Sequence, residues 1–215
     1  MIATVAADSV WTAPPPDPAM EPGEAAVWFL DVGATGPVQT VLAEYLGVQP
    51  GSVVLRRSST GKPEPVGSPL QVSLAHSGEV ALVAIAHGIQ IGVDVERLRS
   101  GTDGWSLVTH ALAAGEKAML RAFPAARRSE AFLSMWTRKE AILKAAGVGL
   151  AVDPRLLELA GPRIVVVPPE LGRARDWSLV DVELPGYAAA LAVRGSLASV
   201  ALYDARSQPG AERSA

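Results

Sequence analysis

Two acidic side chains stand two residues apart near the end of one apolar run. The run from residue 91 to 96 is Ile-Gly-Val-Asp-Val-Glu. Side chains alternate between the faces of a strand, so Asp94 and Glu96 should share one face with Gly92. The apolar setting and the small Gly92 should leave room beside them for a ligand. A strand whose polar face is simply solvated is the other interpretation of this pattern.

A second group of charged residues lies on a predicted helix over residues 129–146. Apolar residues recur at helical spacing from Phe132 to Ala146 and predict a buried stripe. Glu140 and Lys144 are four residues apart and lie together at the margin of that stripe. An ordinary ion pair on a helix surface has the same spacing.

Two shorter segments, at predicted turns, each carry one candidate side chain, Lys62 and His76. One is Gly61-Lys62-Pro63, and the other is Ser73-Leu74-Ala75-His76-Ser77-Gly78. The histidine segment lacks the nucleophile elbow of a serine hydrolase. Taken one at a time, neither segment identifies a site.

The elements that must position these residues alternate between strands and helices. Strands are predicted at 25–30, 52–55, 80–86 and 89–96, the last two as a hairpin around His87-Gly88. Helices are predicted at 37–46, 105–123 and 129–146, followed by strands at 163–167, 177–182, 188–194 and 198–203. This order predicts an α+β fold of two subdomains, over 25–97 and 98–205. An extended arm over 1–24 and a disordered tail over 206–215 should flank them.

Composition narrows the class of protein. The chain has 215 residues, of which 49% are hydrophobic, and no cysteine. A disulfide framework, a thiolate nucleophile and a cysteine zinc site are therefore excluded. The net charge of −3 gives no sign of nucleic-acid binding, and no apolar run is long enough to span a bilayer. We therefore expect a cytoplasmic protein without a nucleic-acid or membrane partner.

The order of the four segments is more specific than any one of them. The succession of G-K-P, S-L-A-H-S-G, I-G-V-D-V-E and W-T-R-K-E-A-I-L-K, from about residue 55 to 150, resembles the 4′-phosphopantetheinyl transferases of the Sfp type. The resemblance implies a pseudo-dimer of two similar α/β subdomains with the active site in the cleft between them. It also implies transfer of the 4′-phosphopantetheine arm of coenzyme A to a serine of an apo carrier protein, with release of 3′,5′-ADP.

The resemblance also assigns roles to individual residues. Asp94, Glu96 and Glu140 are expected to bind Mg²⁺, with Mn²⁺ as an alternative ion, and Glu116 matches a further acid near the metal. Glu140 is the expected catalytic base, and Lys144 is expected to stabilise the transferring phosphate. Lys62 and Lys139 match lysines at coenzyme A phosphates, and His76 matches a residue at the 3′-phosphate. The residues expected to bind coenzyme A are Arg56, Lys62, His76, Asp94, Lys139 and Lys144.

The expected partner is an acidic, helical apo carrier protein of fatty acid, polyketide or nonribosomal peptide synthesis. The basic and apolar stretch 117–128 is the best local candidate for receiving it, and a solvated basic helix end is the alternative. With both halves of the cleft in one chain, we expect a monomer. Two other functions stay open: a non-catalytic relative that binds carrier proteins or coenzyme A, and another Mg²⁺-dependent phosphoester hydrolase. The first alternative rests on Ala75, where family members usually have a serine, and on the absence of arginines from the predicted helix at 37–46, where family members tend to carry them.

Overall fold

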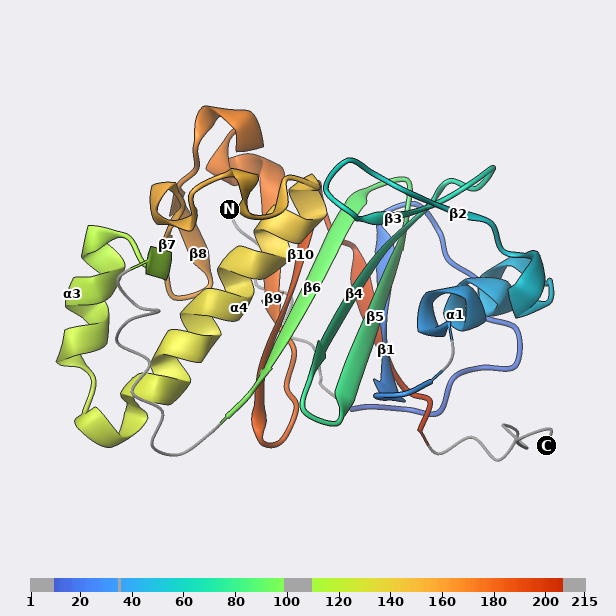
Figure 1. The fold of residues 1–215 in the computed structure, drawn as a ribbon, viewed down its shortest axis with the longest axis horizontal. Helices are drawn as coiled ribbons and strands as arrows, with labels where there is room; N and C mark the ends of the chain where they lie inside the picture. The colour runs from blue at the N-terminus through green and yellow to red at the C-terminus, as the bar shows by residue number, and fades with distance from the viewer. Residues whose placement is uncertain (1–9, 35, 99–109, 207–215) are drawn as a thin grey trace.

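Two β-sheets pack face to face, and helices cover their outer faces (Figure 1). The computed structural model describes residues 10–34, 36–98 and 110–206. The first sheet has the strand order β11-β1-β5-β4, and the second has the order β6-β10-β9. The strands of the first sheet are β1 (Glu24–Asp31), β4 (Leu70–Ser77), β5 (Val80–His87) and β11 (Ser199–Asp204); those of the second are β6 (Gln90–Arg97), β9 (Trp177–Asp181) and β10 (Tyr187–Arg194).

The outer face of the first sheet is covered by α1 (Pro37–Leu46). Pro37 occupies the first turn, where a missing N–H costs nothing, and Gly47 ends the helix in the left-handed conformation. Val41 and Leu42 are fully buried against the sheet together with Trp28 of β1. The amphipathic pattern of α1 therefore determines which face of this sheet is closed to solvent.

The outer face of the second sheet is covered by α4 (Arg128–Ala146). The helix packs on β6 and β10 through small residues: Ala141 and Ala145 of the helix meet Ala190 and Ala192 of β10. Beside it lies α3 (Ala114–Ala122), joined to α4 by the turn at Pro124. Two short hairpins complete the described strands: β2 (Leu55–Arg57) with β3 (Pro63–Pro65), and β7 (Glu158–Ala160) with β8 (Arg163–Val166).

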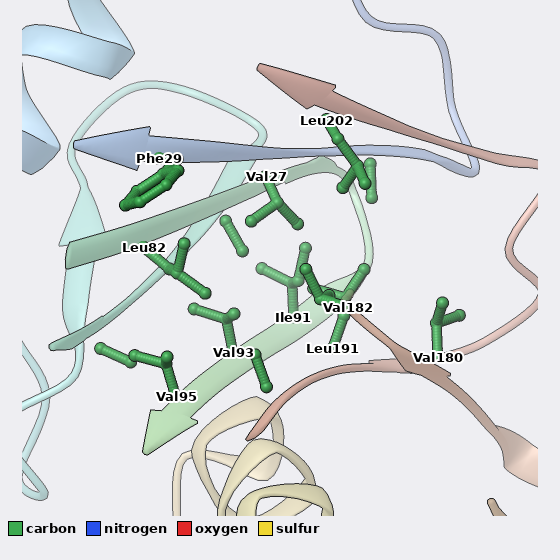
Figure 2. Packing of buried hydrophobic residues seen from close by; sticks show 14 of the residues in the cluster. Val27, Phe29, Leu82, Ile91, Val93, Val95, Val180, Val182, Leu191 and Leu202 are labelled. Carbon is green, nitrogen blue, oxygen red and sulfur yellow. The ribbon is translucent and has the colours of Figure 1, made fainter. Parts of the chain in front are cut away.

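The inner faces of the two sheets share one aliphatic core (Figure 2). Val27 of β1 and Leu82 of β5 face Val93 of β6 and Leu191 of β10 across it, and all four side chains are fully buried. Because alternate residues of β6 point into this core, Gly92, Asp94 and Glu96 must face the opposite way, toward α4.

The predicted hairpin of residues 80–86 and 89–96 is wrong in its pairing, although both segments are strands. β5 pairs with β1 on one edge and with β4 on the other, and β6 pairs with β10. A strand has only two edges, so β5 has none left for β6, and the chain crosses to the second sheet. The partner of β5 in a hairpin is β4, which the sequence interpretation treated as a turn region.

Two other element predictions need correction. Residues 50–52 form a single 3₁₀ turn that begins at Pro50, so the strand expected at 52–55 starts only at Leu55. The helix expected at 105–123 is interrupted: His110 and Ala111 are helical, and α3 begins only at Ala114, because Ala113 is extended. Residues 105–109 and the tail at 207–215 lie outside the described residues.

The two expected subdomains exchange strands. β6 lies before the predicted boundary at residue 97 but pairs with β10, and β11 lies after it but pairs with β1 in parallel. The arm before β1 also joins β11, because the N–H of Thr12 donates to the carbonyl of Leu202 at 3.0 Å. The division at residue 97 stays a prediction.

No helix within the described ranges is long and apolar enough to cross a membrane.

Candidate active site

The backbone of α4 lies directly against β6 at Gly92. A Cβ atom at this position would collide with the carbonyl oxygen of Ala141 and the backbone nitrogen of Ala145. The expectation that Gly92 leaves room for a ligand is therefore wrong: the helix itself fills that space. The close approach places the acids that follow Gly92 on β6 opposite the last two turns of α4.

Asp94 lies in this β6–α4 contact with one carboxylate oxygen paired and the other unpaired. Its side chain is 8% exposed, and Lys144 Nζ donates to its Oδ1 at 2.7 Å. Oδ2 is buried and has no hydrogen-bond partner among the described residues. Burial raises the pKa of Asp94 to about 7, although the ammonium group of Lys144 acts in the opposite direction. An unpaired buried carboxylate oxygen is costly in a structural role and is more typical of a binding site.

Glu140 and Glu96 lie in the electrostatic field of the same site. Burial raises the pKa of Glu140, Lys144 lowers it, and the negative charge of Glu96 raises it further. Both glutamates also raise the pKa of Asp94. The structure thus brings together the three acids and the lysine that the sequence analysis identified. They come from β6 and α4, and Asp94 and Lys144 are 50 residues apart in the sequence.

The donor set suits a hard divalent cation. Carboxylate oxygens are the ligands that Mg²⁺ prefers, and Asp94 Oδ2 has no hydrogen-bond partner in the part of the chain that the structure describes. Within the described ranges, no three acidic or histidine side chains are already arranged tightly enough to hold an ion. The residues therefore fit a cation in their chemistry, although their side chains are not arranged around one in the described structure.

Lys62 does not face this site through its ammonium group. Its Nζ donates to the carbonyl oxygens of Ile91, Lys144 and Ala145 at 2.9, 3.0 and 3.0 Å. These three bonds use all the protons of the ammonium group. Two of them satisfy carbonyls in the last turn of α4, and the third binds the carbonyl of Ile91 on β6. Burial lowers the pKa of Lys62 to about 8. The structure therefore gives Lys62 a capping contact in place of the expected phosphate contact.

Lys139 is also placed away from solvent. It forms a fully buried ion pair with Glu116 of α3, and both side chains are 0% exposed. Its Nζ also donates to the carbonyls of Ala111 and Pro154, at 2.9 Å each. The carboxylate of Glu116 accepts N–H groups from Ala113 and Leu159. This saturated network leaves neither residue able to contact coenzyme A or a metal ion without the pair opening.

The remaining expected contacts lie outside the β6–α4 cluster. His76 is exposed near the end of β4, and Arg56 is paired with Glu64 across the β2–β3 hairpin at 2.7 Å, with its side chain 75% exposed. Ala75 is 4% exposed and packs into the core between the sheets. The sequence interpretation also gave no role to Ser77, whose Oγ donates to Glu96 Oε2 at 2.9 Å.

Comparison with known proteins connects this cluster to a family. The family model described as the 4′-phosphopantetheinyl transferase superfamily matches residues 90–192. The chain is 37% identical over 165 residues to the 4′-phosphopantetheinyl transferase HetI of Nostoc sp., an alignment that covers 74% of this chain and 68% of HetI. The chain belongs to the 4′-phosphopantetheinyl transferase superfamily.

Other relatives match a smaller part of the chain. The 4′-phosphopantetheinyl transferase AcpT of Salmonella typhi is 33% identical over 108 residues, covering 45% of this chain and 56% of AcpT. The 4′-phosphopantetheinyl transferase of Bacillus subtilis is 26% identical over 116 residues, covering 54% of this chain and 50% of that protein. The residues that the superfamily model matches include β6, α3, α4 and most of β10. They therefore include Asp94, Glu96, Glu140 and Lys144. Arg56, Lys62 and His76 precede the matched residues.

Proposed function

We propose that this chain transfers the 4′-phosphopantetheine arm of coenzyme A to a serine of an apo carrier protein, as a transferase of the Sfp type. The observation that carries the proposal is the buried, unpaired Oδ2 of Asp94 beside Lys144 and Glu140. Membership of the superfamily supports the same reaction. The serine oxygen forms a bond to the phosphorus next to pantetheine, the phosphoanhydride bond breaks, and 3′,5′-ADP leaves.

Asp94, Glu96 and Glu140 are the residues that would hold a divalent cation, with Mg²⁺ as the proposed ion and Mn²⁺ as its substitute. Bound there, the ion would neutralise negative charge on the pyrophosphate. The proposal for the ion rests on the unpaired oxygen of Asp94 and on the all-carboxylate donor set.

Glu140 is the proposed base for the serine hydroxyl. A base works best when its pKa approaches the operating pH, and burial raises the pKa of Glu140. Lys144 is the proposed group that stabilises charge on the transferring phosphate. Only one of its ammonium protons is used by Asp94, which leaves others for phosphate oxygens.

The proposed partner is an acidic, helical carrier protein that docks on the segment 117–128. Arg121 and Arg127 are exposed there, and Phe123 is 39% exposed between them. A groove of about 290 Å³ lies beside Phe123 and Arg127, along the first turns of α4. Arg128 is less available to a carrier protein, because its guanidinium group donates to the carbonyls of Arg121 and Phe123 at the end of α3. Such a basic and apolar surface suits an acidic helix.

We further propose that the enzyme acts as a cytoplasmic monomer.

Mass spectrometry of the carrier protein tests the reaction. Incubation with coenzyme A, Mg²⁺ and an apo carrier should add about 340 Da to the carrier, the mass of the transferred arm. Glu140→Gln should slow the transfer by about 100-fold or more, because the serine proton loses its acceptor. Absence of the added mass across carriers from fatty acid, polyketide and peptide synthesis would refute the proposal if a known transferase modifies them.

The same samples separate the two alternatives. Binding of carrier or coenzyme A without added mass would favour a non-catalytic relative. Release of phosphate from simple phosphoesters, lost in Asp94→Ala, would favour a hydrolase.

A further inference from the structure

Two serine hydroxyls join β4 to β6, which belong to different sheets but lie side by side (Figure 1). The N–H of Val93 donates to Ser73 Oγ at 3.1 Å, and the N–H of Arg97 donates to Ser77 Oγ at 3.0 Å. The donors and the acceptors are each four residues apart, so the same contact occurs twice along the two strands. These contacts satisfy backbone N–H groups of β6 that face β4.

The two serines differ in what their own protons do. Ser77 Oγ also donates to Glu96 Oε2 at 2.9 Å, whereas Ser73 lies next to aliphatic core residues and contacts no carboxylate in the described structure. Since a hydroxyl carries one proton, and Ser77 Oγ already accepts from Arg97, its proton is directed at Glu96. Ser77 therefore holds both the side chain of Glu96 and the backbone that follows it.

We propose that Ser77 is a positioning residue that orients the carboxylate of Glu96 toward the cation site, an inference that rests on the proposed function. Glu96 is half-buried at the end of β6, where three rotatable bonds would otherwise let its carboxylate sample several directions. The hydrogen bond fixes Oε2, and Oε1 is left for the cation. Hydrogen-bond partners of metal-binding carboxylates commonly affect metal affinity by about 10-fold to 100-fold.

Cation binding without turnover tests this role. Free Mn²⁺ is titrated by electron paramagnetic resonance against the full chain in the presence of coenzyme A and without a carrier protein. Ser77→Ala should weaken Mn²⁺ binding by about tenfold, because the carboxylate loses its orienting hydrogen bond. Ser77→Thr, which keeps the hydroxyl, should bind Mn²⁺ with the affinity of the unmodified chain.

Ser73→Ala is the matched control. It also removes a hydroxyl that accepts a backbone N–H of β6, so both alanine variants should lose similar thermal stability. Mn²⁺ affinity should nevertheless remain unchanged in Ser73→Ala. Equal weakening of Mn²⁺ binding in Ser73→Ala and Ser77→Ala would overturn the proposal, because the serine would then act only through the β4–β6 contact.

Glu96→Gln and a parallel transfer assay separate this proposal from the proposed function. Unchanged Mn²⁺ affinity in Glu96→Gln would also overturn the role of Ser77, since Ser77 acts through that carboxylate. Transfer of the 340 Da arm by the unmodified chain, measured in parallel, would still uphold the proposed function in that case.

Discussion

At the scale of single residues, Asp94 is the centre of the proposed site because its carboxyl group is buried, and burial disfavours the ionised form. Burial raises its pKa to about 7, and Lys144 compensates only in part. A site that binds a cation at Asp94 would remove this electrostatic cost, which gives the ion a physical reason to bind there.

The pKa of Asp94 predicts a pH-dependent effect of Asp94→Asn on stability. The pKa is higher in the folded chain than in the unfolded chain, so ionised Asp94 destabilises the fold. This cost is absent below pH 4, grows between pH 4 and about 7, and is constant above. Asp94→Asn should therefore raise the free energy of unfolding more at pH 8 than at pH 5, measured by denaturant titration in EDTA. An equal gain at both pH values would contradict the assigned pKa shift.

The residues of the site could be predicted from the sequence to different extents. Strand alternation pairs Asp94 with Glu96, and helix spacing pairs Glu140 with Lys144. The resemblance to the transferase family was needed to join the two pairs into one site. The roles of Lys62 and Lys139 could not be predicted in this way. Their ammonium groups bind backbone carbonyls and a buried carboxylate from distant segments, and only the folded chain brings these groups together.

At the scale of elements, the contact of α4 with β6 determines where the site forms. Gly92 is the narrowest point of this contact, since a side chain there would strike the backbone of α4 at Ala141 and Ala145. The sequence identified Gly92 as a small residue beside two acids, but it could not show whether a ligand or a helix fills the space.

Gly92→Ala should destabilise the protein by about 3 kcal/mol, because α4 must move away from β6 to accommodate the added Cβ. Gly51→Ala is the control, because a Cβ there meets no atom within 4 Å. Thermal and denaturant unfolding of both variants provides the measurement. Equal stability of Gly92→Ala and Gly51→Ala would show that the helix does not pack as closely as described.

The Glu116–Lys139 pair is the second contact that fixes α4, in this case against α3. Lys139→Ala should cost about 3–5 kcal/mol of stability, since it leaves the carboxylate of Glu116 buried without its partner. Arg56→Ala breaks an exposed pair and should cost less than about 1 kcal/mol. If instead Lys139→Ala kept full stability and lost only affinity for coenzyme A, Lys139 would be a phosphate ligand as the resemblance first implied.

At the scale of the whole molecule, the two sheets share a core and exchange strands between the halves of the chain. Local patterns identified most of the strands and α1, but not the partners of β5 and β6, because period-two alternation specifies a face and not a neighbour. The parallel pairing of β11 with β1 joins segments about 175 residues apart, such as Glu24 and Ser199. No local signal in the sequence specifies such a pairing.

This exchange predicts that the N-terminal half does not fold alone. A fragment of residues 1–97 lacks β10 and β11, so β6 and β1 would each expose an unpaired edge and half of the shared core. Its proton–nitrogen NMR spectrum should show the narrow dispersion of an unfolded chain, whereas the full chain should unfold in one cooperative transition. A well-dispersed fragment spectrum would support two independent subdomains instead.

The central claim is that Asp94, Glu96 and Glu140 form the cation site at which coenzyme A reacts. A crystal structure of the full chain with coenzyme A and Mn²⁺, read by the anomalous signal of the ion, tests it most directly. We predict one peak bound by Asp94 and Glu96 of β6 and Glu140 of α4, in contact with the pyrophosphate and within reach of Lys144. A peak elsewhere, or coenzyme A bound with its pyrophosphate away from the β6–α4 contact, would contradict the account.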